Sequence, residues 1–208
     1  MAANTTHPAH PPARSDDEQP SADKLLQGLV PFEDKLLKQR QIVITGTIND
    51  KVAHATVQRL LAMAADGDDP ITMFVSSPGG HVESGDMIFD MVRFIKPKVY
   101  MVGTGWVASI AALIFVAVPK ERRFCLPNTR FLLHQPSGGT GGPAADLAIQ
   151  AEQIIKMRAR LNKLIAEATG QPVKRVDEDT DRDYWMTPEE AIEYGLLGKV
   201  VTSVSEVG

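Results

Sequence analysis

The sequence has one cysteine, no long apolar run and no excess of charge of either sign. Because Cys125 stands alone among 208 residues, neither an intrachain disulfide nor a cysteine-based metal site is available. The longest apolar run, residues 107–118, is well short of the roughly 20 residues that a membrane-spanning helix needs. The first residues lack the basic start and apolar stretch of a secretory signal, so we expect a cytoplasmic protein in a reducing setting.

The charge balance narrows the function classes further. A formal net charge of −4, from 22 basic and 26 acidic residues, predicts no basic face for nucleic acid and no polybasic patch for a membrane. No Gly-Lys-Ser or Gly-Lys-Thr follows a glycine-rich loop, which argues against nucleotide binding by this chain. With 43% hydrophobic residues, the chain is long enough for one well-buried domain.

The chain begins with a proline-rich segment and then becomes regular. Residues 1–24 have no apolar periodicity and are predicted to form a disordered tail. Strands are expected at residues 42–45, 71–75 and 99–102, each followed by a turn and a helix with an apolar stripe. Residues 103–105, Gly-Thr-Gly, are expected to form the third turn. This alternation predicts an α/β fold with a mostly parallel sheet, whose ligand site lies at the carboxyl ends of the strands.

The later half predicts further strands and a long helix. Strands are expected around Phe124, at residues 131–134 and at residues 200–204. An apolar face persists over residues 144–169, which predicts a helix of roughly 39 Å at 1.5 Å per residue that protrudes from a small domain. Residues 187–190, Thr-Pro-Glu-Glu, read as a capping box that begins another helix.

Two residues are candidates for acid–base and nucleophilic chemistry. Ser109 lies among small residues at the expected start of the third helix, where backbone amides can stabilise an oxyanion, although its hydroxyl needs a base. Taken alone, Ser109 fits a simple helix cap better than a nucleophile. His134 ends an apolar strand and is a candidate general base, with His81 as the alternative and a structural histidine as the simpler interpretation.

The remaining parts of a catalytic site are less well defined by the residues. Spacing cannot select an orienting carboxylate, because five acids crowd one segment: Asp177, Glu178, Asp179, Asp181 and Asp183. Gly79-Gly80 offers a backbone amide for a substrate carbonyl, or an ordinary turn.

Over about residues 40–201 the sequence resembles the ClpP proteolytic subunits of ATP-dependent Clp proteases. The shared motifs are Ser77-Pro78-Gly79-Gly80, Phe94-Ile95-Lys96-Pro97, Ala108-Ser109, Arg123-Phe124-Cys125-Leu126-Pro127-Asn128, His134-Gln135-Pro136 and Asp179-Thr180-Asp181-Arg182-Asp183. The resemblance implies an α/β spiral of repeated ββα/βαβ units, related to the crotonase fold. It also implies a peptidase domain over residues 25–208, with a handle strand and helix over about residues 135–169.

The resemblance assigns roles to individual residues. It implies a serine endopeptidase whose catalytic residues are Ser109, His134 and Asp183, with the amides of Gly80 and Ile110 as the oxyanion hole. A strand that includes Gln135, Pro136, Gly138 and Gly139 is expected to bind the substrate backbone by strand addition. Asp181 and Arg182 are expected to couple ring contact to activation. No metal or other cofactor is expected in this chain.

The resemblance also implies an assembly. Unfolded polypeptides are expected to be cut to short peptides inside two stacked heptameric rings, a tetradecamer. A Clp-family AAA+ ATPase such as ClpX or ClpA, which uses the ATP, is expected to feed that chamber. Two departures leave the ATPase partner open: the segment before the first strand, residues 32–41, is short, and Thr72 and Thr104 stand in an apolar docking patch.

Two alternatives remain at this point. The first is a weakly active or structural ring subunit that pairs with an active ClpP paralogue. The second is an acyl-CoA hydratase or hydrolase of the related crotonase fold, which does not require the Ser109 and His134 pair.

Overall fold

A computed structural model describes residues 32–136, 141 and 143–207. The chain divides into two units, residues 1–35 and 36–208. In the first unit the described residues, 32–35, are helical. The expected tail over residues 1–24 lies outside the described residues and stays a prediction.

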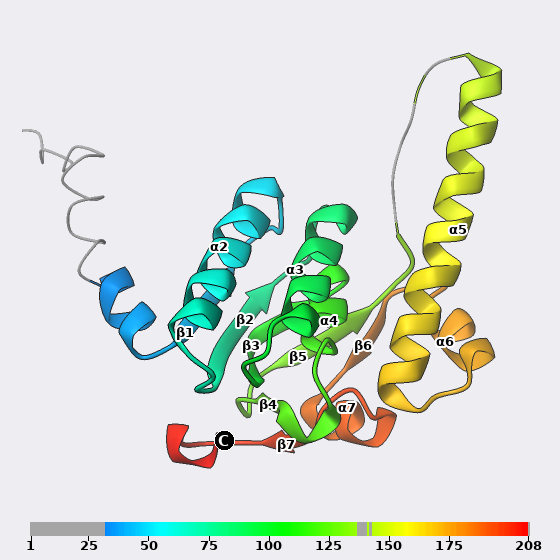
Figure 1. The fold of residues 1–208 in the computed structure, drawn as a ribbon. Coiled ribbons are helices and arrows are strands. Elements are labelled where there is room, and N and C mark those ends of the chain that lie inside the picture. The colour runs from blue at the N-terminus through cyan, green and yellow to red at the C-terminus, as the bar shows by residue number, and fades with distance from the viewer. Residues whose placement is uncertain (1–31, 137–140, 142, 208) are drawn as a thin grey trace, which may run out of the picture. The chain divides into compact units, whose positions relative to one another are not determined.

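The second unit is built on a single sheet, which is mostly parallel (Figure 1). Strand order is β1-β2-β3-β4-β7, while β5 pairs with the far half of β3 and β6 runs antiparallel beside β5. The described strands are β1 (Gln41–Thr45), β2 (Ile71–Ser77), β3 (Val99–Ala108), β4 (Arg123–Cys125), β5 (Arg130–Leu133), β6 (Tyr184–Met186) and β7 (Lys199–Val200).

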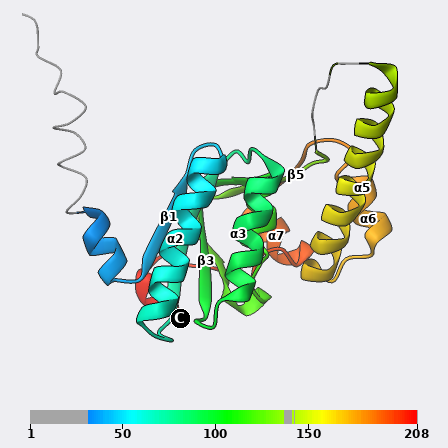
Figure 2. The same ribbon diagram turned by 45° about the horizontal axis from the view of Figure 1, so that its top comes forward.

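Helices cover one face of this sheet, as Figures 1 and 2 show for α2, α3 and α4. The described helices are α2 (Asp50–Asp66), α3 (Val82–Phe94), α4 (Ile110–Phe115), α5 (Ala144–Thr169), α6 (Val173–Asp179) and α7 (Pro188–Tyr194), with short 3₁₀ turns η1 (Lys120–Arg122) and η2 (Val204–Glu206). The alternation of strands and helices confirms the expected α/β class. No helix in the described part of the chain is both long and apolar enough to span a bilayer.

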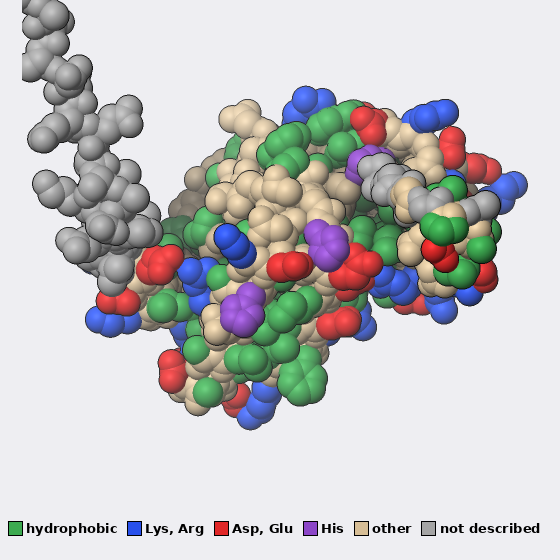
Figure 3. All heavy atoms as spheres, turned by 90° about the horizontal axis from the view of Figure 1, so that it is seen from above, with side chains coloured by type: hydrophobic (Ala, Val, Ile, Leu, Met, Phe, Trp, Pro, Cys, Tyr) green, Lys and Arg blue, Asp and Glu red, His purple; other side chains and the backbone are tan. Residues whose placement is uncertain are grey.

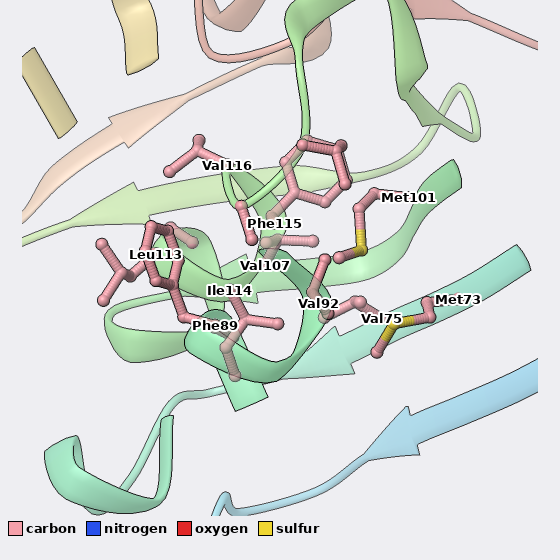
Figure 4. Close-up of a cluster of buried hydrophobic side chains, with 14 of the residues drawn as sticks. Met73, Val75, Phe89, Val92, Met101, Val107, Leu113, Ile114, Phe115 and Val116 are labelled. Atoms are coloured by element: carbon pink, nitrogen blue, oxygen red, sulfur yellow. The ribbon is translucent and has the colours of Figure 1, made fainter. Parts of the chain in front are cut away.

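The main core lies between the sheet and the helices α3 and α4 (Figure 4). Every residue of α4 is buried, and Phe115 packs against Phe131 of β5 with ring centroids 5.5 Å apart. Full burial of a side chain of this size contributes about 1.5–3 kcal/mol to the stability of the fold. The buried side chains of α4 therefore hold this helix firmly in position. The side chains labelled in the figure are Met73, Val75, Phe89, Val92, Met101, Val107, Leu113, Ile114, Phe115 and Val116.

Two local expectations are wrong. Residues 103–105 do not form a turn: β3 continues through them, with a bulge in which one residue of β2, Ser76, faces three of β3, residues 104–106, between the pairs Val75–Gly103 and Ser77–Val107. Pairing with β2 on one side and with β4 and β5 on the other continues the strand past this bulge, where Gly105 has a positive φ of 62°. The last strand ends at Val200, because the Glu206 carboxylate accepts from the amides of Thr202 and Ser203 and turns the chain into η2.

The long helix α5 has the expected bounds and extends beyond the sheet (Figure 1). Gly170 ends it in the left-handed conformation, with φ of 77°. Its first half is solvent-exposed over residues 145–153, whereas Ile165 and Ala166 near its end are buried in the core. The helix is therefore anchored at one end and projects at the other.

Candidate active site

Ser109 occupies the junction between β3 and α4. Its backbone has φ of 58°, a left-handed conformation that is uncommon for a residue with a side chain. The Ser109 amide donates to the Leu132 carbonyl of β5 at 2.9 Å, and the helix continues directly into the buried core. Ser109 is thus not the simple side-chain cap that its sequence context suggested, since its hydroxyl makes no capping hydrogen bond.

His134 lies beside this hydroxyl because of the sheet register. Ala108 of β3 pairs in parallel with Leu132 of β5, so the residues that follow the two strands emerge together at the carboxyl edge. The distance between His134 Nε2 and Ser109 Oγ is 2.7 Å. The imidazole is therefore in position to accept the hydroxyl proton.

Asp183 completes a line of three groups. Because β6 is antiparallel to β5 with Tyr184 opposite Leu133, the residue before β6 lies next to His134. Asp183 Oδ1 is 3.4 Å from His134 Nδ1, which is longer than an ordinary hydrogen bond, and the carboxylate side chain is 65% exposed. The other four acids of that segment have different partners: Asn162 for Asp177, Lys174 for Glu178, Tyr194 for Asp179 and Arg158 for Asp181.

The glycine pair runs along the opposite side of Ser109. The Ile48 amide donates to the Gly79 carbonyl at 2.8 Å, and the His81 amide donates to the Ile48 carbonyl at 2.9 Å. This parallel bridge leaves the Gly80 N–H pointing away from Ile48. Ile110 is the first residue of α4, so its N–H has no acceptor within the helix.

Steric crowding explains why both positions are glycine. A Cβ atom on Gly79 would lie 2.6 Å from Ser109 Cβ, and one on Gly80 would lie 2.1 Å from the Ile48 carbonyl oxygen. Their φ angles, 97° and 151°, also fall in the region that favours glycine.

An apolar cavity of about 40 Å³ opens beside the Ser109 hydroxyl. We call it the first cavity. Val82, Pro136, Leu161 and Ile165 line it with apolar atoms, and Asn162 and Thr180 add polar atoms. A volume of this size is about that of one water, so the cavity accepts a small apolar side chain.

The other predicted residues fall around this centre. The Gln135 amide donates to the Thr180 carbonyl at 2.7 Å, and Pro136 lines the first cavity. Arg182 is 93% exposed and lies 4.0 Å from Asp181. Gly138 and Gly139 lie outside the described residues. The alternative base, His81, contacts Ser84, Asp50 and Glu83 instead of Ser109.

Two residues of α5 that the sequence did not reveal as site residues, Arg158 and Asn162, hold the segments around the site in place. Arg158 of α5 donates to Gln135 Oε1 at 3.0 Å and to the Asp177 carbonyl at 3.1 Å. Four residues on, Asn162 donates to Asp177 Oδ1 at 2.5 Å and is 3% exposed. Arg158 and Asn162 are polar residues four apart, next to the apolar stripe of the predicted helix, and this spacing is the sequence signal that could have identified them.

Comparison with known proteins identifies the family. The family model described as Clp protease matches residues 29–204. The "ATP-dependent Clp protease proteolytic subunit 3" of Rhizobium etli is 58% identical and covers 93% of this chain and 100% of the relative. Subunit 2 of Pseudomonas aeruginosa is 54% identical, over 82% of this chain and 85% of the relative.

A solved structure agrees with the sequence relatives. A mutant of ClpP1 from Listeria monocytogenes superposes with a TM-score of 0.80 at 45% identity, covering 85% of this chain and 99% of that chain. The sheet with its projecting helix is thus the fold of this family. The chain belongs to the ClpP family, the proteolytic subunits of Clp proteases, and is a protease.

Proposed function

We propose that the chain is a serine endopeptidase with Ser109 as nucleophile, His134 as general base and Asp183 as the carboxylate that orients the imidazole. The 2.7 Å distance between Ser109 Oγ and His134 Nε2 supports this proposal most directly. The Asp183 contact favours the tautomer with the proton on Nδ1, which leaves Nε2 free to accept. The reaction needs no metal or other cofactor in this chain.

The proposed reaction has two halves. Ser109 Oγ bonds to the peptide carbonyl carbon while its proton moves to His134 Nε2, and the N–H groups of Gly80 and Ile110 hold the oxyanion. The carbon–nitrogen bond then breaks, and the imidazolium returns the proton to the leaving amine. Water attacks the acyl-enzyme in the same way and releases the second product. One oxyanion donor of this type contributes about 2.7–4 kcal/mol to the barrier reduction.

The proposed substrates are unfolded polypeptides, bound as an added strand. Gln135 and Pro136 lie next to the first cavity, and the proposed strand continues through Gly138 and Gly139, which lie outside the described residues. An extended peptide there presents its scissile carbonyl to Ser109 and one side chain to the first cavity.

Assembly is part of the proposal. The exposed apolar residues Leu147, Ile149 and Ile155 of α5 suit contact between two stacked heptameric rings. The 3.4 Å separation of Asp183 from His134 is expected to shorten when the neighbouring Asp181 and Arg182 engage the opposite ring. A Clp-type AAA+ ATPase would dock at the sheet face on which Phe74 and Tyr100 are partly buried and Leu126 is exposed.

A second candidate is a weakly active or structural ring subunit that pairs with an active paralogue. The long Asp183 contact favours it, because an unoriented imidazole is a poor base. Sedimentation velocity combined with hydrolysis of fluorogenic peptides separates the two. The main proposal expects large particles of the protein alone that cleave peptides, and at least a 1,000-fold loss in Ser109→Ala. Large particles without activity would favour the second candidate.

A further inference from the structure

A second cavity adjoins the first one along the expected path of the substrate. Its volume is about 190 Å³, the room of about six waters, which suits one long side chain. Gly80, His81, Val82 and Glu83 form one wall, and Pro136, Ile154 and Met157 form the other. Val82 and Pro136 line both cavities, so the two are direct neighbours.

The spacing of the two cavities matches an extended peptide. The first cavity contacts α5 at Leu161, Asn162 and Ile165, and the second contacts it at Ile154 and Met157. The nearest of these residues, Met157 and Leu161, are four helical residues or about 6 Å apart, and side chains two residues apart on one face of an extended strand are about 6.6 Å apart. A peptide with one side chain in the first cavity therefore brings the side chain two residues away to the second.

Hydrogen bonds around His81 leave two acceptors facing one another at this cavity. Ser84 donates its single hydroxyl proton to Asp50 Oδ1 at 2.6 Å, so its oxygen accepts from the Nδ1–H of His81 at 2.8 Å. In this tautomer His81 Nε2 carries a lone pair, and it lies 3.1 Å from the Glu83 Oε2 acceptor. A proton or another cationic donor placed between these two acceptors stabilises the pair.

One cation of α5, Arg160, already has a partner. It makes a bidentate contact with Asp86, at 2.9 and 2.5 Å. Acidic side chains and histidines lie next to one another on the face seen in Figure 3. The carboxylate of Glu83 is 62% exposed, so a substrate cation can reach it from solvent.

We propose that the second cavity is a subsite that selects a lysine or arginine side chain of the substrate, two residues from the side chain in the first cavity. This inference rests on the proposed function. Val82, Pro136, Ile154 and Met157 pack against the aliphatic stem, while Glu83 and His81 Nε2 accept from the ammonium or guanidinium group.

The test uses matched fluorogenic peptides that differ only by lysine against norleucine, which keeps the stem and removes the charge. The pair is placed two residues from the cleaved-bond residue, first on its amino side and then on its carboxyl side. We expect kcat/KM for the lysine peptide to be about three- to fivefold higher at one of these positions, the range of an exposed ion pair. A ratio near one at both positions would overturn the proposal.

Variants of Glu83 test whether the preference for lysine over norleucine comes from the pair of His81 and Glu83. Glu83→Gln is expected to bring the ratio of kcat/KM for the lysine and norleucine peptides to about one, and Glu83→Lys is expected to favour a glutamate peptide. The control is Glu121→Gln, which changes an exposed acid of η1 and should keep the wild-type ratio. Cleavage of the norleucine peptide at the wild-type rate shows that a variant is folded, because this peptide carries no charge at the tested position. An unchanged ratio in Glu83→Gln would refute the assignment.

If neither peptide is cleaved and Ser109 does not react with a fluorophosphonate, the proposed function fails instead; cleavage without a charge preference refutes the subsite alone.

Discussion

Gly79→Ala tests how tightly the glycine segment holds the nucleophile. The added Cβ would lie 2.6 Å from Ser109 Cβ and 2.9 Å from the Ala108 carbonyl oxygen. Carbon atoms in ordinary contact are about 3.5–4.0 Å apart, so Ser109 or the glycine segment must move by about 1 Å. The left-handed backbone adds about 1–2 kcal/mol and the overpacking about 1–3 kcal/mol of destabilisation.

The expected outcome is a folded protein with a misplaced nucleophile. A displacement of about 1 Å lowers the catalytic rate by about 100-fold, which is measured as kcat/KM on a fluorogenic peptide. Urea unfolding should show a loss of about 2–5 kcal/mol in the free energy of unfolding.

Gly170→Ala is the matched control. Gly170 also has a positive φ, 77°, but its added Cβ would meet no atom within 4 Å. This variant should lose about 1–2 kcal/mol of stability and keep wild-type kcat/KM. Wild-type kinetics in Gly79→Ala, or equal losses of activity in both variants, would refute the reasoning.

Three further predictions concern stability and reactivity. Burial, followed by the hydrogen bond to Asp179, raises the pKa of Tyr194, so stability in urea should be constant below about pH 10 and fall above it, with a smaller fall in Tyr194→Phe. Burial raises the pKa of Cys125 to about 11, so mass spectrometry should find iodoacetamide adducts on it only after denaturation. Thr187→Ala removes the capping box with Glu190 and should lower the unfolding free energy by about 1 kcal/mol in urea.

Local signals in the sequence predicted the elements whose ends are set by nearby residues. Asn49 caps α2 through its side chain, and Thr187 and Glu190 form the predicted box, because such caps involve atoms only three residues apart. The glycines of β3 were misread for the opposite reason. Hydrogen bonds to strands distant in sequence decide that segment, and a pattern of nearby residues does not contain them.

The candidate site was likewise predictable from the sequence only in part. Ser109 and His134 were visible as candidates because each follows a strand, yet their 2.7 Å contact depends on the register between β3 and β5. Asp183 needed the resemblance, since five acids were equivalent in sequence until the antiparallel pairing of β6 placed one of them beside His134. The roles of Arg158 and Asn162 depend on where α5 packs against α6, because both side chains donate to Asp177 of that helix.

The central proposal is that Ser109 is the nucleophile activated by His134. The most direct test is a mass-spectrometric map of the fluorophosphonate adduct on the assembled particle. We expect a single adduct on Ser109 in the wild type, and loss of that adduct in His134→Ala, because the hydroxyl then has no base. An adduct on another serine, or a folded particle that acquires none, would contradict the account.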